Sequence, residues 1–89
     1  MKVAELQRLE QGNKTMEEFI QEFRIAARES GYKEHPLIEE FKQGMNRAIR
    51  RKLMEAEYQP GTMEQWYERA TTLDRNWRES RRKEERLRG

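Results

Sequence analysis

The side chains that could carry chemistry are few, and their spacing does not favour it. His35 is the only histidine among 89 residues, and the sequence contains no cysteine. A histidine without a second histidine one helical turn away, or without a thiolate partner, is weak evidence for a metal ligand or a general base. Glutamates occur as doublets beside basic residues, at 17–18, 39–40 and 84–85. Such doublets suit a solvated surface rather than the apolar setting that raises a carboxyl pKa.

The sequence also has no glycine-rich phosphate loop, no nucleophile elbow and no Ser/His/Asp set. We therefore expect no enzymatic activity, no cofactor and no bound metal. Because there is no cysteine, a disulfide framework and a thiolate zinc site are both excluded, which favours a reducing compartment. No apolar run approaches the roughly 18 residues of a membrane span, so no membrane partner is expected.

The composition predicts one all-helical domain. Charged residues make up 40% of the chain, hydrophobic residues 34%, and there are only two prolines, a balance typical of helices with charged outer faces. Eighty-nine residues are near the size at which a single hydrophobic core suffices without staples. The predicted fold class is all-α, a compact five-helix bundle.

The best-marked helix follows Thr15. Thr15 and Glu18 form a capping-box pattern, and Gly31 supplies the left-handed position that commonly ends a helix. Apolar residues recur between these ends at the 3.6-residue period, which predicts a helix with one wide buried stripe. The stripe comprises Met16, Phe19, Ile20, Phe23, Ala26 and Ala27.

Four further helices are predicted around this one. A short helix ends before Gly12, a third runs from Pro36 to Gly44 after a loop at 32–35, a fourth is capped by Asn46, and a fifth begins after Thr62. Together with the central helix they should bury one core. The predicted core residues are Leu6, Leu9, Met16, Ile20, Leu37, Ile38, Phe41, Ile49, Leu53, Trp66, Ala70 and Leu73.

The apolar pattern of the last helix fades at Trp77, so residues 78–89 are predicted to be a charged helical tail that frays, within a single domain over 1–89. Basic residues outnumber acidic ones there, and others crowd the outer side of the fourth helix. The candidate nucleic-acid contacts are Arg47, Arg50, Arg51, Arg78, Arg81 and Arg82. Interleaved glutamates favour solvent-facing ion pairs instead, so any nucleic-acid binding is expected to be weak.

The turn and helix at the start of the chain resemble the major homology region of retroviral and retrotransposon Gag capsid proteins. The matching residues are Gln11, Gly12, Thr15, Glu18, Phe19 and Phe23. Two later runs, Phe41-Lys-Gln-Gly44-Met45 and Ile49-Arg-Arg-Lys-Leu53, are similar to gypsy-type retrotransposon Gag, as are Thr62 to Trp66 and Leu73 to Arg78. The resemblance covers nearly the whole chain and points to the capsid C-terminal domain, or C-lobe, of such a Gag or of a domesticated, Arc-like relative.

The chain departs from that pattern in three ways. Lentiviral members carry an arginine just before the second aromatic residue, as part of a polar network with the glutamine and the glutamate, but Glu22 occupies this position. The interval from Gln11 to Phe19 is one residue shorter than in those proteins. The zinc knuckle that often follows in Gag is missing, because there is no cysteine. The resemblance therefore carries over the turn and the aromatic roles, without the full polar network.

The resemblance implies a structural protein that self-associates weakly as a two-fold dimer and links capsid units in a cytoplasmic virus-like particle. Its implied partners are further copies of itself and an N-terminal capsid domain of the full-length protein. Candidate dimer residues are Glu39, Glu40 and Gln43 on the third helix, and Val3 on the first. Two alternatives are a SCAN-like dimerisation module, which a leucine-rich seam would favour, and an RNA-binding module that uses the fourth helix and the tail.

Overall fold

The computed structural model describes residues 3–88, which form five α-helices and no strand. In chain order these are α1 (Val3–Arg8), α2 (Met16–Ser30), α3 (Glu34–Gly44), α4 (Arg47–Glu55) and α5 (Met63–Arg88). The predicted all-α fold class is confirmed.

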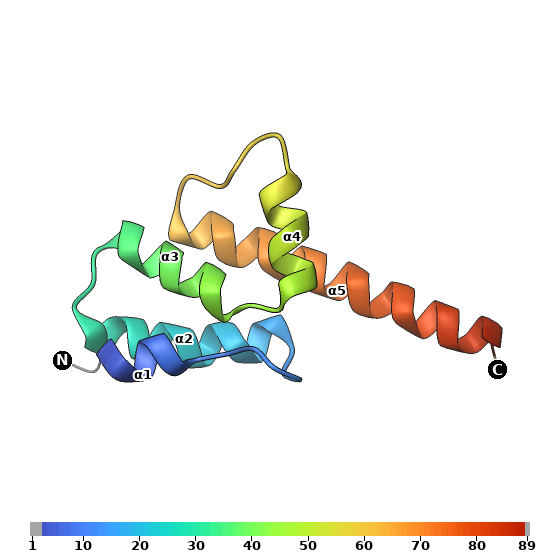
Figure 1. The fold of residues 1–89 in the computed structure, drawn as a ribbon, viewed down its shortest axis with the longest axis horizontal. Helices are drawn as coiled ribbons and strands as arrows, with labels where there is room; N and C mark the ends of the chain where they lie inside the picture. Colours follow the sequence, from blue (N-terminus) through green and yellow to red (C-terminus); the bar gives the residue numbers. More distant parts are fainter. Residues whose placement is uncertain (1–2, 89) are drawn as a thin grey trace.

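The longest helix, α5, is the element on which most of the others assemble. It packs against α2, α3 and α4, while α1 packs against α2 and α3. Figure 1 shows α1 and α2 side by side, α4 standing steeply across α5, and the second half of α5 projecting beyond the other helices. The 26 residues of α5 span about 39 Å, which accounts for most of the 49 Å length of the molecule. Every residue from Glu79 to Arg88 is exposed, and the predicted fraying of this segment stays a prediction.

The predicted ends of α2 are confirmed. The Thr15 hydroxyl accepts the Glu18 backbone N–H at 3.2 Å, and the Glu18 carboxylate accepts the Thr15 backbone N–H at 3.1 Å. The Thr15 hydroxyl also donates to the Glu18 carboxylate at 3.0 Å. The hydrogen bonds that the carboxylate accepts from the Thr15 backbone N–H and then from the Thr15 hydroxyl hold the pKa of the exposed Glu18 carboxyl below its ordinary value. At the other end Gly31 adopts φ 75°, in the left-handed region that glycine enters without steric cost.

An aromatic cluster holds three helices together at the centre of the core. Phe19 of α2 stacks on Phe41 of α3 with ring centroids 5.5 Å apart, and Phe23 meets Phe41 edge-on at 5.3 Å. Tyr67 of α5 closes the cluster, edge-on to Phe41 at 5.1 Å. All four rings are buried, and each such side chain contributes roughly 1.5–3 kcal/mol through burial. Tyr67 was not among the predicted core residues, because it lies beside the apolar stripe read from α5.

The other predicted core residues divide by their degree of burial. Three of them, Leu9, Leu37 and Leu73, are partly buried and pack against the core. The buried ones are Leu6, Met16, Ile20, Ile38, Phe41, Ile49, Leu53, Trp66 and Ala70.

The third helix begins earlier than predicted. It starts at Glu34 instead of Pro36, so His35 is an exposed helical residue and not part of a loop. Proline is tolerated at the third position because the first amides of a helix have no partner within it. The earlier start also gives Glu34 a role, since its carboxylate accepts the backbone N–H of Met63 at 3.0 Å, at the beginning of α5.

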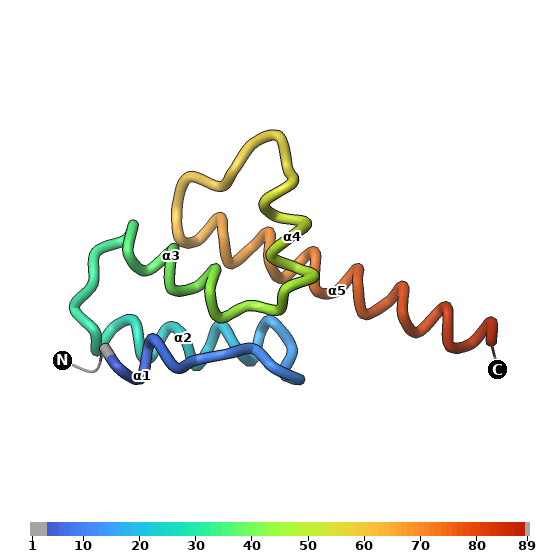
Figure 2. The backbone as a smooth tube through the Cα atoms, in the orientation of Figure 1, coloured from blue at the N-terminus to red at the C-terminus, as the bar shows by residue number. Residues whose placement is uncertain are grey.

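Asn46 occupies the N-cap position of α4, but its side chain makes no capping hydrogen bond. The prediction that Asn46 caps α4 is therefore right in position, but the expected side-chain hydrogen bond is absent. The Asn46 backbone N–H donates instead to the side-chain oxygen of Gln11 at 3.0 Å. Beyond α4, Figure 2 shows the connection to α5 looping outward before it returns. The Gln59 side chain fixes this loop by donating to the Leu53 carbonyl at 2.9 Å, at the C-terminal end of α4.

Candidate functional site

Gln11 is the centre of a buried polar junction. Its side-chain nitrogen donates to the Asp74 carboxylate at 3.1 Å and to the Lys14 carbonyl at 3.2 Å. Its side-chain oxygen accepts the Asn46 N–H, and its own backbone N–H donates to the Gly44 carbonyl at 2.8 Å. The Gln11 side chain is 0% exposed. It therefore ties the turn before α2 both to the α3–α4 connection and to α5.

Asp74 completes the junction from α5. Its second carboxylate oxygen accepts the backbone N–H of Met16 at 3.0 Å and the Arg78 side chain at 3.0 Å. Arg78 also donates to the Lys14 carbonyl at 2.7 Å. Met16 is the first residue of α2, so a carboxylate from a distant helix caps the positive end of the α2 dipole. No buried side-chain nitrogen or oxygen of residues 3–88 lacks a hydrogen-bond partner.

Asp74 was not among the predicted site residues, although a signal for it existed in the sequence. Asp74 follows Ala70 by four residues and precedes Trp77 by three, so it lies on the apolar stripe of α5. A carboxylate at a stripe position predicts a buried polar contact, because an unpaired buried charge is very costly. The same reasoning would have separated Arg78, one turn further on, from the exposed arginines of the tail.

Glu22 takes no part in this junction. It forms an ion pair with Lys14, with Nζ and Oε2 2.6 Å apart, on the outside of α2. The position that is an arginine in the lentiviral pattern is thus used for a surface contact. In this chain Asp74 supplies the charged partner of Gln11, and Arg78 in turn contacts Asp74.

Two glycines allow the backbone to make the junction. Gly12 adopts φ 55° with open space around it, so the turn after Gln11 requires its left-handed conformation rather than its small size. Gly44 is different, because a Cβ there would lie 2.6 Å from the Leu9 carbonyl oxygen and 2.7 Å from Cζ of Phe19. Only a residue without a side chain lets the end of α3 approach both groups.

Next to the aromatic cluster, Arg24 covers the Tyr67 ring with its guanidinium carbon 4.5 Å from the ring centroid. The same guanidinium makes two hydrogen bonds of 3.1 Å to the Glu64 carboxylate. Burial of the hydroxyl raises the pKa of Tyr67 to about 12, against the opposing effect of the Arg24 charge. This tyrosine is a structural group and stays protonated at neutral pH.

The candidate dimer residues of α3 lie at the surface. Glu39 and Gln43 are exposed and Glu40 is half-buried. Glu39 pairs with Lys42 at 3.0 Å, and the Lys42 ammonium lies 5.3 Å from the ring centroid of Trp66. The Val3 side chain lies outside the part of the chain that the structure describes.

The candidate nucleic-acid residues fall into two groups. Arg78 is engaged in the junction, and the Arg81 guanidinium carbon lies 5.0 Å from the ring centroid of Trp77. Arg82 is exposed on the tail. On α4, Arg47 and Arg51 are exposed and Arg50 is half-buried, and none of these three forms an ion pair within residues 3–88. Of the six candidates, Arg47, Arg50, Arg51 and Arg82 therefore form neither an ion pair nor a contact with an aromatic ring among the described residues.

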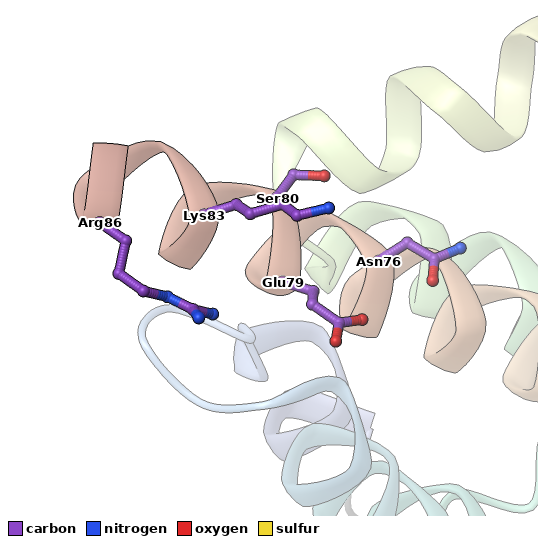
Figure 3. A pocket seen from close by; sticks show the side chains of 5 residues that line it. All are labelled: Asn76, Glu79, Ser80, Lys83 and Arg86. Carbon is purple, nitrogen blue, oxygen red and sulfur yellow. The ribbon is translucent and has the colours of Figure 1, made fainter. Parts of the chain in front are cut away.

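One hollow on the surface is lined by Asn76, Glu79, Ser80, Lys83 and Arg86 (Figure 3). All five side chains come from one helix, α5, at spacings of three and four residues, so no second element walls a ligand in. Within residues 3–88 no group of three or more His, Cys, Asp or Glu side chains could hold a metal ion. The described helices also include none that is both long enough and apolar enough to cross a membrane.

Comparison with known proteins yields one family. The family described as "PEG10/RTL1, C-terminal capsid-like domain" matches residues 3–77. The match takes in α1 to α4 and the part of α5 up to Trp77, which includes Asp74 but not Arg78, and it ends before the exposed tail. No curated protein sequence matches the chain. The resemblance to a capsid C-terminal domain is confirmed.

Proposed function

The chain belongs to the family of PEG10/RTL1 C-terminal capsid-like domains, and on that premise we propose that it is a structural capsid module that self-associates through a two-fold contact. The observation that carries the proposal is the family match over residues 3–77, which covers α1 to α4 and the first part of α5. The residues around Gln11 and Asp74 support this body as a rigid unit, and they bind neither substrate nor cofactor in this proposal. The same role places the protein in cytoplasmic virus-like particles.

The outer face of α3 is the proposed contact. It carries exposed Glu39 and Gln43 and half-buried Lys42 within about one helical turn, with half-buried Glu40 beside them. In a two-fold contact residue i of one copy meets residue j of the other, and j meets i. A face that holds both an acid and a base satisfies this requirement, because Glu39 and Lys42 of one copy can pair with Lys42 and Glu39 of the next.

Such a contact is expected to be weak. Solvent-exposed ion pairs contribute about 0–1 kcal/mol each, and the α3 face lacks the large aromatic anchors of a strong interface. Weak contacts suit a shell, because many of them act together and each can open and close during assembly. An N-terminal capsid domain in the full-length protein is the proposed second partner, and it would supply the remaining contacts.

Sedimentation equilibrium of the 89-residue chain from micromolar to millimolar concentration tests the two-fold contact. We expect a monomer–dimer equilibrium that Glu40→Arg shifts to monomer while the helical circular-dichroism signal stays unchanged. Glu68→Arg makes the same charge change at an exposed position of α5 and should leave the equilibrium as it is. A chain that stays monomeric at millimolar concentration, or a dimer that both variants weaken equally, would reject the α3 contact.

A further inference from the structure

The α4 helix presents four positive charges that form no ion pair among the described residues. Its apolar side is buried through Ile49 and Leu53, both 0% exposed, so its basic residues are left on the outer side. These basic residues are Arg47, Arg50, Arg51 and Lys52. Within residues 3–88 none of their side chains forms an ion pair or a side-chain hydrogen bond. Five other cations do pair with carboxylates, namely Lys14, Arg24, Lys42, Arg75 and Arg78. The cations from Arg81 to Arg88 in the tail form no ion pair among the described residues either, but three glutamates lie beside or among them in sequence, at 79, 84 and 85.

An apolar side chain lies among these charges. Met54 is seven residues after Arg47, four after Arg50 and three after Arg51, and residues at these spacings are neighbours on one face of a helix. Met54 is 52% exposed. The outer face of α4 therefore combines guanidinium groups with an accessible apolar contact.

An exposed aromatic residue, Tyr58, follows the C-terminal end of α4 in sequence. Tyr58 is 76% exposed, yet the loop that carries it is anchored on both sides. The Arg69 side chain donates to the Tyr58 carbonyl at 2.7 Å, and the neighbouring Gln59 side chain donates to the Leu53 carbonyl at 2.9 Å. The backbone is thus fixed while the ring faces solvent.

We propose that the outer face of α4, together with Tyr58, binds single-stranded nucleic acid. The guanidinium groups of Arg47, Arg50 and Arg51 would hold successive phosphates, since their planar donors match phosphate oxygens. A base would stack on Tyr58, as bases do on the aromatic platforms of single-strand-binding proteins. An exposed ring needs an unstacked base, which favours a single strand over a duplex.

The remaining cations and the acidic neighbours limit the proposal. Arg78 and Arg81 on α5 already contact Asp74 and Trp77, so they are less available than the α4 arginines. Glu55 and Glu57 lie close to the face in sequence and reduce its net charge. Binding should therefore be weak and sensitive to salt. This property goes beyond the capsid role and does not depend on the α3 contact.

Fluorescence anisotropy of a labelled single-stranded oligouridylate with the 89-residue chain, measured over a series of salt concentrations, tests the proposal. Replacing both Arg47 and Arg51 by Gln should weaken binding and lower the slope of log affinity against log salt by about 1.4, since each phosphate contact on a single strand contributes about 0.7. Replacing both Arg81 and Arg82 by Gln removes the same charge from the tail and serves as the matched control. That control should retain most of the binding.

Tyr58→Ala tests the stacking step separately. We expect single-strand affinity to fall about 5-fold or more, since a base stacked on an aromatic side chain contributes about 1–3 kcal/mol. Binding of a duplex of equal length should be unchanged. All the substituted positions are exposed, and circular dichroism will verify that each variant folds.

Three results would overturn the proposal. Equal losses in the two arginine pairs would show that total charge, and not the α4 face, governs binding. Unchanged single-strand affinity in Tyr58→Ala would show that no base stacks on the Tyr58 ring. The third result is a chain that binds no oligonucleotide and instead self-associates more weakly when Arg47 and Arg51 are replaced. That result would show that the α4 face binds an acidic surface of a second copy of the chain.

Discussion

The side-chain nitrogen of Gln11 lies 3.1 Å from the carboxylate of Asp74, although 63 positions separate the two residues in sequence. This contact joins the turn that precedes α2 to the middle of α5. Asp74 is the only aspartate in the sequence, and its other oxygen accepts the first backbone amide of α2. One carboxylate therefore fixes both the turn and the start of the central helix.

Asp74→Ala should lower the free energy of unfolding by about 2–4 kcal/mol, because it leaves the Gln11 amide and the Met16 N–H without their buried acceptor. Urea denaturation followed by circular dichroism measures the change. Glu79→Ala alters an exposed residue of the same helix and should stay within about 0.5 kcal/mol of the parent. If the two variants lose equal stability, the buried contact does not support the fold.

Gly44→Ala tests the close approach of α3 to the turn. The added methyl group would overlap the Leu9 carbonyl and the Phe19 ring, and we expect a loss of about 1–3 kcal/mol from overpacking. Gly61→Ala is the control, because its nearest neighbour would be the Gln65 side-chain oxygen at 3.5 Å, an ordinary contact. Thermal and urea unfolding of both variants give the comparison. A stabilised Gly44→Ala, as helix propensity alone would predict, would contradict the packing argument.

Arg78 and Arg82 are a matched pair for the boundary between the folded body and the tail. Arg78→Gln removes charged hydrogen bonds to Asp74 and to the Lys14 carbonyl. It should cost about 1–2 kcal/mol, less than a fully buried contact because the Arg78 side chain is 30% exposed. Arg82→Gln should change the unfolding free energy by less than about 0.5 kcal/mol. If the two variants are equally stable in urea, the contacts of Arg78 with Asp74 and the Lys14 carbonyl do not stabilise the fold.

The raised pKa of Tyr67 predicts that the folded chain loses stability in alkaline solution. Its pKa is about 12 in the folded chain and 10.0 without burial, so the folded state holds the hydroxyl proton more tightly than the unfolded state. The stabilising contribution is fully present below pH 10 and is lost as the pH rises towards 12. Tyr67→Phe should flatten this alkaline decline in unfolding experiments between pH 9 and pH 12. A decline of unchanged steepness in the variant would show that Tyr67 does not cause it.

The sequence predicted those parts of the fold that depend on neighbouring residues. The Thr15–Glu18 capping box and the Gly31 helix end use contacts within a few residues, and the 3.6-residue period of α2 reports which of its sides is buried. These signals survive in a single sequence because their cause is local. They established five helices and much of the core, and the major-homology pattern identified the turn at Gln11.

The features that the sequence did not predict depend on contacts between distant elements. Asn46 has the residue type of a helix cap, but its backbone N–H donates to the Gln11 side-chain oxygen instead. This hydrogen bond forms only because the turn at Gln11 and the α3–α4 connection meet in space. The start of α3 at Glu34 depends on the position of Met63, whose N–H the carboxylate accepts.

The sequence by itself therefore determined the helices, their buried sides and the family, because helical periodicity and capping are properties of short segments. Only the tertiary structure decided that Asp74 is the buried partner of Gln11 and that Gly44 must lack a side chain. It also decided that the α4 arginines form no ion pair within residues 3–88 and that Tyr58 is exposed. Those outcomes depend on which groups compete for the same space and the same hydrogen bonds, and this competition exists only once the helices have packed.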